Sequence, residues 1–174
     1  GSSWVPCRNF SRVAKAPQLA AISTTWTSDK KLELSHPSIG KICIDPDLDS
    51  SKFINWVSPL MPGNRAASVK LIRSVQTGMT DTDFPSISIG NLASHREIEK
   101  KVGEKLSLLR WRCNLWIDGC EPWDEHKWIG KNLKIGEVTF KIEEEIVRCL
   151  ATTANPMSGE RDVDTLGTLE SLGK

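Results

Sequence analysis

The chain of 174 residues has no tyrosine, no long apolar run and no excess charge of either sign. A helix that crosses a bilayer needs about 20 consecutive apolar residues, and no segment supplies them. The N-terminus also lacks a charged leader followed by an apolar stretch. The 23 basic and 22 acidic residues nearly cancel, and no block of like charge forms an arm or tail. Composition therefore gives no support for binding to nucleic acid or to a membrane surface, and we expect any bound anion to meet only a few local cations.

Spacings typical of structural metal sites are also missing. The carboxylates Asp45, Asp47 and Asp49 lack the glycine and the distal glutamate of a calcium loop. The cysteines are odd in number, are widely spread and include no CxxC pair or Cys/His cluster; they are Cys7, Cys43, Cys113, Cys120 and Cys149. A reducing compartment explains such unpaired cysteines most simply, so we expect a cytoplasmic protein.

No catalytic triad or redox motif can be assembled from the sequence. His36, His95 and His126 lie in a turn, at a helix start and in a Trp-Asp-Glu-His-Lys-Trp loop, and none stands near a glycine-framed serine or near Cys149. A cysteine-histidine hydrolase stays open through tertiary contact alone. Flavin, haem and iron–sulfur motifs are absent, so electrons for any redox reaction would have to come from a separate partner.

Tryptophan supplies most of the aromatic surface, with seven residues in the chain. Indoles of this number are typical of a core and its rim, because each buries a large area and needs one partner for its N–H. Stacking on a planar cofactor ring is the alternative for Trp111 or Trp123.

Short apolar segments separated by turn residues predict mainly β structure with a few helices. Antiparallel strands are expected between residues 19 and 44. A first helix should follow the cap residues 49–51 and end before Pro59. A second helix should begin at a capping box formed by Ser94 and Glu97, because the apolar residues that follow have helical spacing.

Two longer segments, 108–118 and 133–150, also have the alternation of strands. Val138, Phe140 and Ile142 alternate with polar residues, which would turn one face inward and the other outward. The architecture that we predict is a mainly β (α+β) fold, a mostly antiparallel barrel with two or three peripheral helices.

One of these strands would carry a group of cations. Arg110, Arg112 and Asn114 alternate, so a regular strand would place all three on the same face. Two guanidiniums and an amide on one face can grip a phosphate or carboxylate, because arginine donates in a planar fork. The alternative is an exposed strand face that is salt-bridged to Glu143 or Asp118.

Cys149 stands in the other informative setting. It directly follows Arg148 and precedes Thr152, Thr153 and the turn residues 155–159. A thiolate at a strand end beside positive charge and hydroxyl donors suits a soft metal or nucleophilic chemistry. The alternative is a small buried apolar residue, which is the more common state of an unpaired cysteine in a strand.

These segments resemble the signature of the MOSC family, named for the C-terminal domain of molybdenum cofactor sulfurase. The resemblance is carried by RWRCNLWIDG, by PWDEHKWIGKNLKIGEVTFKI and by RCLATTANPMSGERDVDTLGTL, from about Leu109 to Leu169. The earlier segment NFSRVAKAPQLAAI is similar to the N-terminal β-barrel portion of stand-alone bacterial members. The resemblance implies a β-barrel of the pyruvate-kinase type, with an N-terminal part at 1–90 and a MOSC core at 91–174 that form one continuous unit. Since members commonly begin earlier and continue further, it also implies a piece of a longer protein.

The resemblance also implies a site. The cysteine after the arginine is the one that holds molybdenum or accepts sulfur in this family, and that position is Cys149. The residues that would hold the anionic pterin or shape the pocket around the metal are Arg110, Arg112, Asn114, Arg148, Thr152 and Thr153. Two positions depart from the family pattern: Asn155 replaces the usual acidic residue, and Cys113 replaces proline.

Three functions follow from the resemblance as hypotheses. The first is a reductase of N-hydroxylated compounds that uses the molybdenum cofactor (molybdopterin) with Cys149 as the metal ligand, and takes electrons from a separate electron-transfer protein. The second is a sulfur carrier, in which Cys149 receives a persulfide from a sulfur donor protein for metal–sulfur cofactor assembly. The third is a non-catalytic cofactor-binding module. Pyridoxal phosphate binding is also associated with the family. A small-molecule substrate is expected, and neither nucleic acid nor a membrane is expected as a partner.

Overall fold

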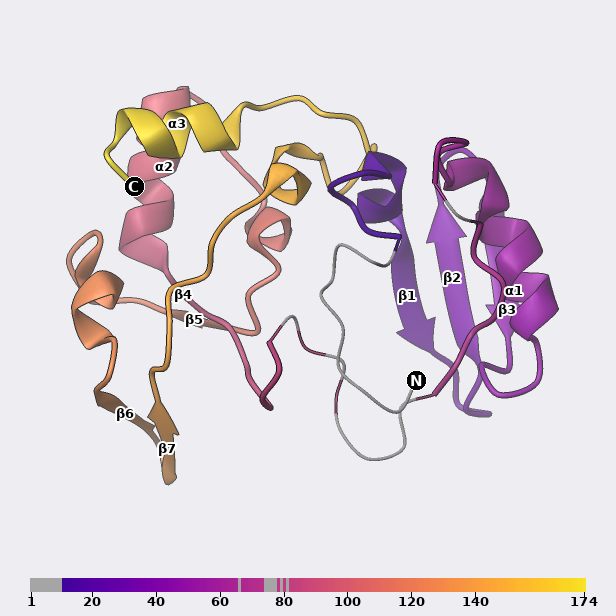
Figure 1. The fold of residues 1–174 in the computed structure, drawn as a ribbon, viewed down its shortest axis with the longest axis horizontal. Helices are drawn as coiled ribbons and strands as arrows, with labels where there is room; N and C mark the ends of the chain where they lie inside the picture. Colours follow the sequence, from indigo (N-terminus) through magenta and orange to yellow (C-terminus); the bar gives the residue numbers. More distant parts are fainter. Residues whose placement is uncertain (1–10, 66, 74–77, 79, 81) are drawn as a thin grey trace.

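The computed structural model describes residues 11–65, 67–73, 78, 80 and 82–174. Within these residues the chain is a mixed α/β protein with three α-helices and three small sheets. The N-terminal sheet and helix α1 lie on one side of the molecule, and helices α2 and α3 lie on the other (Figure 1). None of the helices in the described part is long and apolar enough to cross a membrane. Cys7 and Trp4 lie outside the described residues.

The N-terminal sheet confirms the antiparallel strands expected between residues 19 and 44. It is a meander of β1 (Ser23–Trp26), β2 (Leu32–His36) and β3 (Gly40–Ile44), in the order β1-β2-β3. Leu34 and Ile44 are buried on this sheet, whereas every residue of β1 is exposed. Apolar burial along the second and third strands therefore fixes which face of the sheet is turned inward.

Helix α1 (Ser50–Val57) confirms the first predicted helix and packs beside β3. Asp49 stands at its N-cap but does not cap it with its side chain. The carboxylate instead accepts a hydrogen bond from the backbone N–H of Asp45, with an N···O distance of 2.9 Å. The chain then continues into the short 3₁₀ helix η3 (Ser58–Leu60), in which Pro59 ends the α-helical hydrogen bonding.

Helix α2 (Leu92–Val102) is the second predicted helix, but the predicted capping box is wrong. Asn91 is the N-cap, and its side-chain oxygen accepts from the backbone N–H of Ala93 at 2.9 Å. Ser94 lies inside the helix, where its hydroxyl accepts from the backbone N–H of Trp123 at 2.8 Å. The cap moved because asparagine is at least as good an N-cap as serine, and because a distant loop recruits the serine hydroxyl.

The C-terminal core is built around α2 and a two-stranded parallel sheet. Strand β4 (Ile89–Asn91) leads directly into α2 and pairs with β5 (Leu115–Ile117). The buried residues of this core are Ile98, Leu106 and Trp111, and Trp116 and Trp123 are among the half-buried residues that pack against them. Helix α3 (Thr165–Ser171) packs against α2 and places Leu169 against the same core.

Gly90 is needed where the backbone of β4 meets an indole. A Cβ atom at this position would lie 2.6 Å from the ring of Trp116. Real Cβ contacts are longer than this, so only glycine lets the two strands pair with the indole in place.

The predicted closed barrel is not found among the described residues. The segment 108–118, predicted as a strand, begins as the 3₁₀ helix η4 (Leu108–Trp111), and only β5 within it is a strand. The segment 133–150 divides into a hairpin of β6 (Asn132–Ile135) and β7 (Val138–Lys141), followed by residues 142–149 without regular structure.

The hairpin is turned through Gly136, which has a φ of +59°. Its alternation was read as an inward and an outward face, yet Val138 on the expected inward side is 54% exposed. The prediction is therefore wrong at Val138, whereas Phe140 and Ile142 are half-buried and their polar neighbours are exposed, as the alternation predicts. The hairpin projects from the molecule in Figure 1.

Contacts also join the N-terminal part to the C-terminal part. Gly159 has a φ of +75°, and a Cβ atom there would lie 2.6 Å from Cα of Gln18, in the 3₁₀ helix η2 (Pro17–Ala21). The guanidinium of Arg161 donates to the carbonyl oxygen of Ala14 at 3.0 Å. Residues before the first strand thus touch the turn that follows Cys149.

Candidate functional site

Cys149 lies at the junction between the irregular segment 142–149 and the 3₁₀ helix η6 (Leu150–Thr153). Its backbone is extended, with φ of −127° and ψ of 176°, and it is the N-cap residue of η6. Its side chain is exposed, so the reading of Cys149 as a buried apolar residue is wrong. Its carbonyl oxygen accepts hydrogen bonds from the backbone N–H and the hydroxyl of Thr152, both at 3.1 Å. The thiol is therefore reachable, while the backbone that carries it is held in place.

The two threonines after Cys149 hold this turn from inside. Thr152 and Thr153 are buried, and the hydroxyl of Thr152 lies 2.6 Å from the hydroxyl of Thr165 at the start of α3. The hydroxyl of Thr153 donates to the carbonyl oxygen of Leu150 at 2.9 Å. Because both hydroxyls are engaged within the protein, the pair supports η6 instead of presenting free donors to a ligand.

Arg110 is buried and also supports the turn. Its guanidinium donates to the carbonyl oxygen of Thr153 at 3.3 Å and pairs with the Asp162 carboxylate at 2.7 Å. Burial by itself raises the pKa of Asp162, but hydrogen bonds from Arg110 and Asn155 outweigh it and bring that pKa below its ordinary value of 3.8. The alternative partners Glu143 and Asp118 are wrong for Arg110.

Asn155 occupies the position at which the family pattern has an acidic residue. Its side-chain amide donates to Asp162 at 2.7 Å, and its side-chain oxygen accepts from the backbone N–H of Met157 at 2.8 Å. A carboxylate at position 155 would face the carboxylate of Asp162 without the N–H donor. The substitution therefore fits its neighbour in this chain.

Arg112 and Asn114 do not share a strand face with Arg110. Arg112 is exposed with a φ of +55°, at the turn that closes η4. The side-chain oxygen of Asn114 accepts from the backbone N–H and the hydroxyl of Ser88, each at 2.9 Å. The predicted common face is wrong because the 3₁₀ turn ends in a left-handed residue, which sends Arg110 inward and Arg112 outward.

Arg148 brings a second cation to this turn. Its guanidinium donates to the carbonyl oxygen of Trp111 at 2.9 Å, lies 3.5 Å from the sulfur of Cys113, and stacks 5.6 Å from the centroid of the Trp111 ring. In the described part of the chain, neither Arg148 nor Arg112 has a carboxylate within 4.0 Å. Arg112 and Arg148, the second of which precedes Cys149 in the sequence, thus carry positive charge that no carboxylate of the described residues neutralises.

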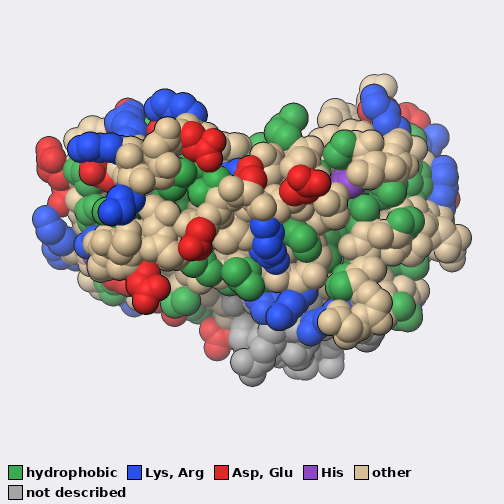
Figure 2. Space-filling view, turned by 90° about the horizontal axis from the view of Figure 1, so that it is seen from above, with side chains coloured by type: hydrophobic (Ala, Val, Ile, Leu, Met, Phe, Trp, Pro, Cys, Tyr) green, Lys and Arg blue, Asp and Glu red, His purple; other side chains and the backbone are tan. Residues whose placement is uncertain are grey.

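Charge elsewhere on the surface is mixed. Figure 2 shows blue and red side chains interspersed over the face seen from above. Among the described residues, no three His, Cys, Asp or Glu side chains gather in a way that could hold a metal ion.

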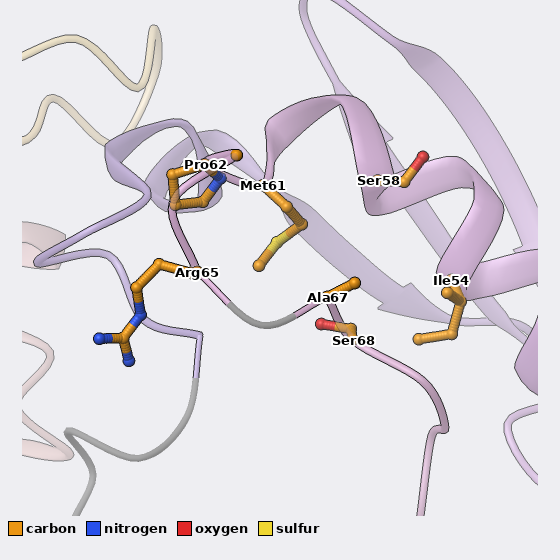
Figure 3. A pocket seen from close by; sticks show the side chains of 8 residues that line it. Ile54, Ser58, Met61, Pro62, Arg65, Ala67 and Ser68 are labelled. Atoms are coloured by element: carbon orange, nitrogen blue, oxygen red, sulfur yellow. The ribbon is translucent and has the colours of Figure 1, made fainter.

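Two surface pockets lie away from these residues. One, of about 250 Å³, is formed beside α1, and the Met61 side chain extends toward Ala67 and Ser68 within it (Figure 3). The other, of about 540 Å³, is lined by Trp26, Asp29, Lys30, Asp45, Pro46, Asp47 and Arg73. Neither pocket contains a residue of the cysteine motif. We place the candidate site at Cys149 because its thiol is exposed and stands in that motif.

Comparison with known proteins gives the family. The model of the MOSC domain matches residues 80–171, which is more than half of the chain. The chain belongs to the MOSC domain family. It is also 40% identical over 156 residues to molybdenum cofactor sulfurase of Drosophila willistoni, an alignment that covers 86% of this chain and 19% of that protein. The chain therefore spans about a fifth of the length of this curated relative.

The MOSC match includes every residue that the sequence assigned to the site, and the structure sorts them into two groups. Cys149, Arg112 and Asn114 are exposed and Arg148 is half-buried, whereas Arg110, Thr152 and Thr153 are buried. The reading of Trp111 as a core residue is confirmed, since it is 5% exposed. The guanidinium of Arg148 lies over its ring, 5.6 Å from the centroid.

Sequence reasoning missed the residues that support the MOSC site from within. Asp162 and Arg161 stand in the last motif, but neither carried a pattern that predicts a partner. His95 and Glu99 were a detectable signal, because their spacing of four residues places both on the face of α2 that also carries Ile98. A polar pair on the apolar face of a helix predicts a buried network.

Proposed function

We propose that this MOSC domain binds the molybdenum cofactor and that Cys149 carries sulfur at that site as a persulfide. The supporting observation is the exposed thiol of Cys149 at the start of η6, directly after Arg148 in the sequence, a cation without a carboxylate within 4.0 Å among the described residues. The family match and the similarity to a molybdenum cofactor sulfurase support a role connected with the molybdenum cofactor.

The residues present fit an anionic cofactor. Arg112 and Arg148 would hold its charged groups, because their guanidiniums are not neutralised within the described chain. Asn114 would stabilise the backbone that follows Arg112 through its hydrogen bonds with Ser88. Arg110, Thr152 and Thr153 would stabilise η6 from the buried side. When bound, the cofactor would supply a soft metal centre that suits sulfur ligands.

The chemistry at Cys149 is a thiol exchange in which atoms and electrons balance. The Cys149 thiolate attacks the outer sulfur of a persulfide on a separate donor protein. The donor's S–S bond breaks, its thiolate leaves, and Cys149 holds the new persulfide. Exposure of the thiol is required for this step, since the attacking and leaving sulfurs must lie in line.

A second candidate is the reductase of N-hydroxylated compounds, with Cys149 as a molybdenum ligand. The exposed thiol of Cys149 supports this candidate, because a thiolate is a ligand that suits a soft metal. Electrons would then come from a separate electron-transfer protein. A third possibility, a cofactor-binding module without turnover, predicts a bound pterin with neither activity.

Persulfide formation on Cys149 tests the sulfur-carrier proposal. The protein without cofactor is treated with a low-molecular-weight persulfide, and the tryptic peptide 149–161 is followed by mass spectrometry. We expect Cys149 to gain one sulfur faster than Cys43, an exposed thiol outside the motif that serves as the matched control. Equal rates at the two cysteines would contradict the sulfur-carrier proposal.

Cofactor content then separates the two candidates. Protein from cells that make molybdenum cofactor is analysed for molybdenum and pterin, together with Cys149→Ser, Arg112→Gln and Arg148→Gln. A sulfur carrier keeps pterin and metal in Cys149→Ser, whereas a metal ligand loses the metal there. Both candidates expect the arginine variants to lose pterin. A wild-type protein with neither pterin nor molybdenum would refute cofactor binding itself.

The proposal also includes a barrel architecture and a single structural unit. A barrel of the pyruvate-kinase type, and a single unit made from parts 1–90 and 91–174, stay predictions that the family suggests. The contacts of Arg161 with Ala14 and of Gly159 with Gln18 support the single unit. A cytoplasmic location stays a prediction as well.

A further inference from the structure

A buried polar network borders the candidate site, and His95 stands at its centre. The indole N–H of Trp111 donates to Nδ1 of His95 at 2.9 Å, and both side chains are buried. Because Nδ1 accepts this bond, the ring proton of the neutral imidazole must be on Nε2. That nitrogen lies 3.3 Å from a carboxylate oxygen of Glu99. The two contacts fix the tautomer and the orientation of the imidazole.

The surroundings of His95 favour this neutral form. Burial lowers the pKa of His95, and the charge of Lys105 adds to this, although Glu99 acts in the opposite direction. Glu99 is itself held by the ammonium of Lys105 at 2.7 Å and by the backbone N–H of Leu106 at 2.9 Å. The edge of the Trp116 ring closes the remaining side, at 5.7 Å between ring centroids.

Trp111 links the His95 imidazole to the Arg148 guanidinium. Two of the contacts that hold the Arg148 guanidinium are made to Trp111, one to its carbonyl oxygen and one to the face of its ring. The third contact is the sulfur of Cys113 at 3.5 Å. If Nδ1 of His95 were lost, the indole N–H would be buried without an acceptor, which favours a rotation of the ring. The ring face that holds the Arg148 guanidinium would then move as well.

We propose that His95 is a positioning residue that acts through Trp111 to hold the guanidinium of Arg148 beside the cysteine motif. Its biological meaning rests on the proposed function, in which Arg148 meets an anionic cofactor. His95 touches neither Arg148 nor Cys149 in the contacts described, so it acts on the site only through the indole.

Cys113 provides a built-in reporter of the guanidinium. In the protein without cofactor, and in a Cys120→Ser background, the tryptic peptide 113–127 reports labelling of Cys113 alone. We compare its rate with the dianionic reagent 5,5′-dithiobis(2-nitrobenzoate) and with neutral 4,4′-dithiodipyridine. The ratio of the two rates measures local positive charge, and a general loosening of the fold, which exposes the thiol to both reagents, does not produce the same change.

Three variants of His95 and Trp111 separate positioning from bulk. His95→Asn keeps an oxygen near the place of Nδ1, and His95→Gln keeps an amide near the place of Nε2. Trp111→Phe keeps a ring face but has no N–H. We expect Arg148→Gln to lower the preference for the anionic reagent about fivefold, as loss of one nearby unit charge should. His95→Gln and Trp111→Phe keep this charge but displace it, so each should lower the preference by a smaller factor, about two- to threefold. His95→Asn should keep most of the preference.

Two results would contradict the proposed role of His95. An unchanged ratio in Arg148→Gln would show that the guanidinium does not sit beside Cys113, and an unchanged ratio in His95→Gln or Trp111→Phe would show that its seat does not depend on the indole bond. Either result overturns the proposal. If His95→Gln fails to fold, Trp111→Phe gives the same test. Because no cofactor is present, a failure to bind molybdenum would refute the proposed function without changing this result.

Discussion

Between residues 23 and 44, the backbone of each strand is paired with the next strand, whereas the turn after Cys149 combines short-range hydrogen bonds with bonds from arginine side chains elsewhere in the chain. The carbonyl oxygen of Leu150 accepts from the hydroxyl of Thr153 and from the guanidinium of Arg161, and the carbonyl oxygen of Thr153 accepts from Arg110. Strand pairing thus satisfies the backbone groups of the meander, whereas the last carbonyl oxygens of a short 3₁₀ helix need additional donors.

The charged pairs of the two regions differ in the same way. Arg73 and Asp47 pair on the surface beside the N-terminal sheet, with side chains 60% and 55% exposed. Arg110, which pairs with Asp162 under the cysteine motif, is 4% exposed. Surface pairs contribute little to stability, whereas a buried charge that loses its partner is costly. The first region therefore depends on apolar burial, and the second depends on a polar network as well.

The largest effect should come from the apolar core of the N-terminal sheet. Ile44 is 1% exposed, and Ile44→Ala should lower the free energy of unfolding by about 4 kcal/mol, because the cavity adds to the lost transfer energy. Urea unfolding measures the loss. Leu48, which is 81% exposed, is the control, and Leu48→Ala should change the stability by less than about 0.5 kcal/mol. Similar losses in both variants would contradict the assigned burial.

Arg110→Met should be the next largest change, at about 3 kcal/mol. It removes the donor to Thr153 and leaves the Asp162 carboxylate without its guanidinium. Arg73→Met removes the same charge from an exposed pair and should have no measurable effect on the urea midpoint. If the two variants lost equal stability, the contrast between the regions would fail.

As the pH falls, the C-terminal region should first lose stability because His95 becomes protonated on unfolding. Its pKa is lowered in the folded protein by burial, so below pH 6.5 the unfolded chain binds a proton that the folded chain does not. Stability is thus present above pH 6.5 and is lost as the pH falls toward the lowered pKa, by up to about 1.4 kcal/mol per pH unit. Urea unfolding between pH 7.5 and 5.0 measures this.

His95→Asn has no imidazole and should show a flatter stability profile in that range. Glu99 and Asp162 act in the same direction but only at lower pH, because their pKa values lie below the ordinary 4.5 and 3.8. A wild-type profile that is flat from pH 7.5 to 5.0 would refute the buried neutral state of His95.

The smallest predicted effect concerns one hydroxyl under Cys149. Thr165 is fully buried, and its hydroxyl lies 2.6 Å from that of Thr152. Thr165→Val keeps the shape and removes this hydrogen bond, so the unfolding free energy should fall by about 1 kcal/mol. Thr24→Val on the exposed strand β1 is the matched control and should be neutral. A neutral Thr165→Val would show that the two hydroxyls are not coupled to stability.

Local patterns predicted much of the N-terminal part and little of the architecture around Cys149. The strands before residue 44 and helix α1 could be predicted because turn residues and apolar alternation act over a few positions. Segment 108–118 has the same alternation, yet its first four residues form the 3₁₀ helix η4, whose Trp111 is buried against α2, and only residues 115–117 form a strand. Periodicity did not distinguish the two cases, because the deciding contact is with residues in another element.

For the candidate site, the sequence alone determined the cysteine motif and its family, since the order of Arg148, Cys149 and the following threonines is a local property of the chain. Only the tertiary structure decided which cations are free and which are buried. Arg110 is neutralised by Asp162, 52 residues away, whereas Arg112 turns outward from the neighbouring turn. Pairing of charges over such separations depends on the packing of distant segments, and the sequence carries no local pattern for it.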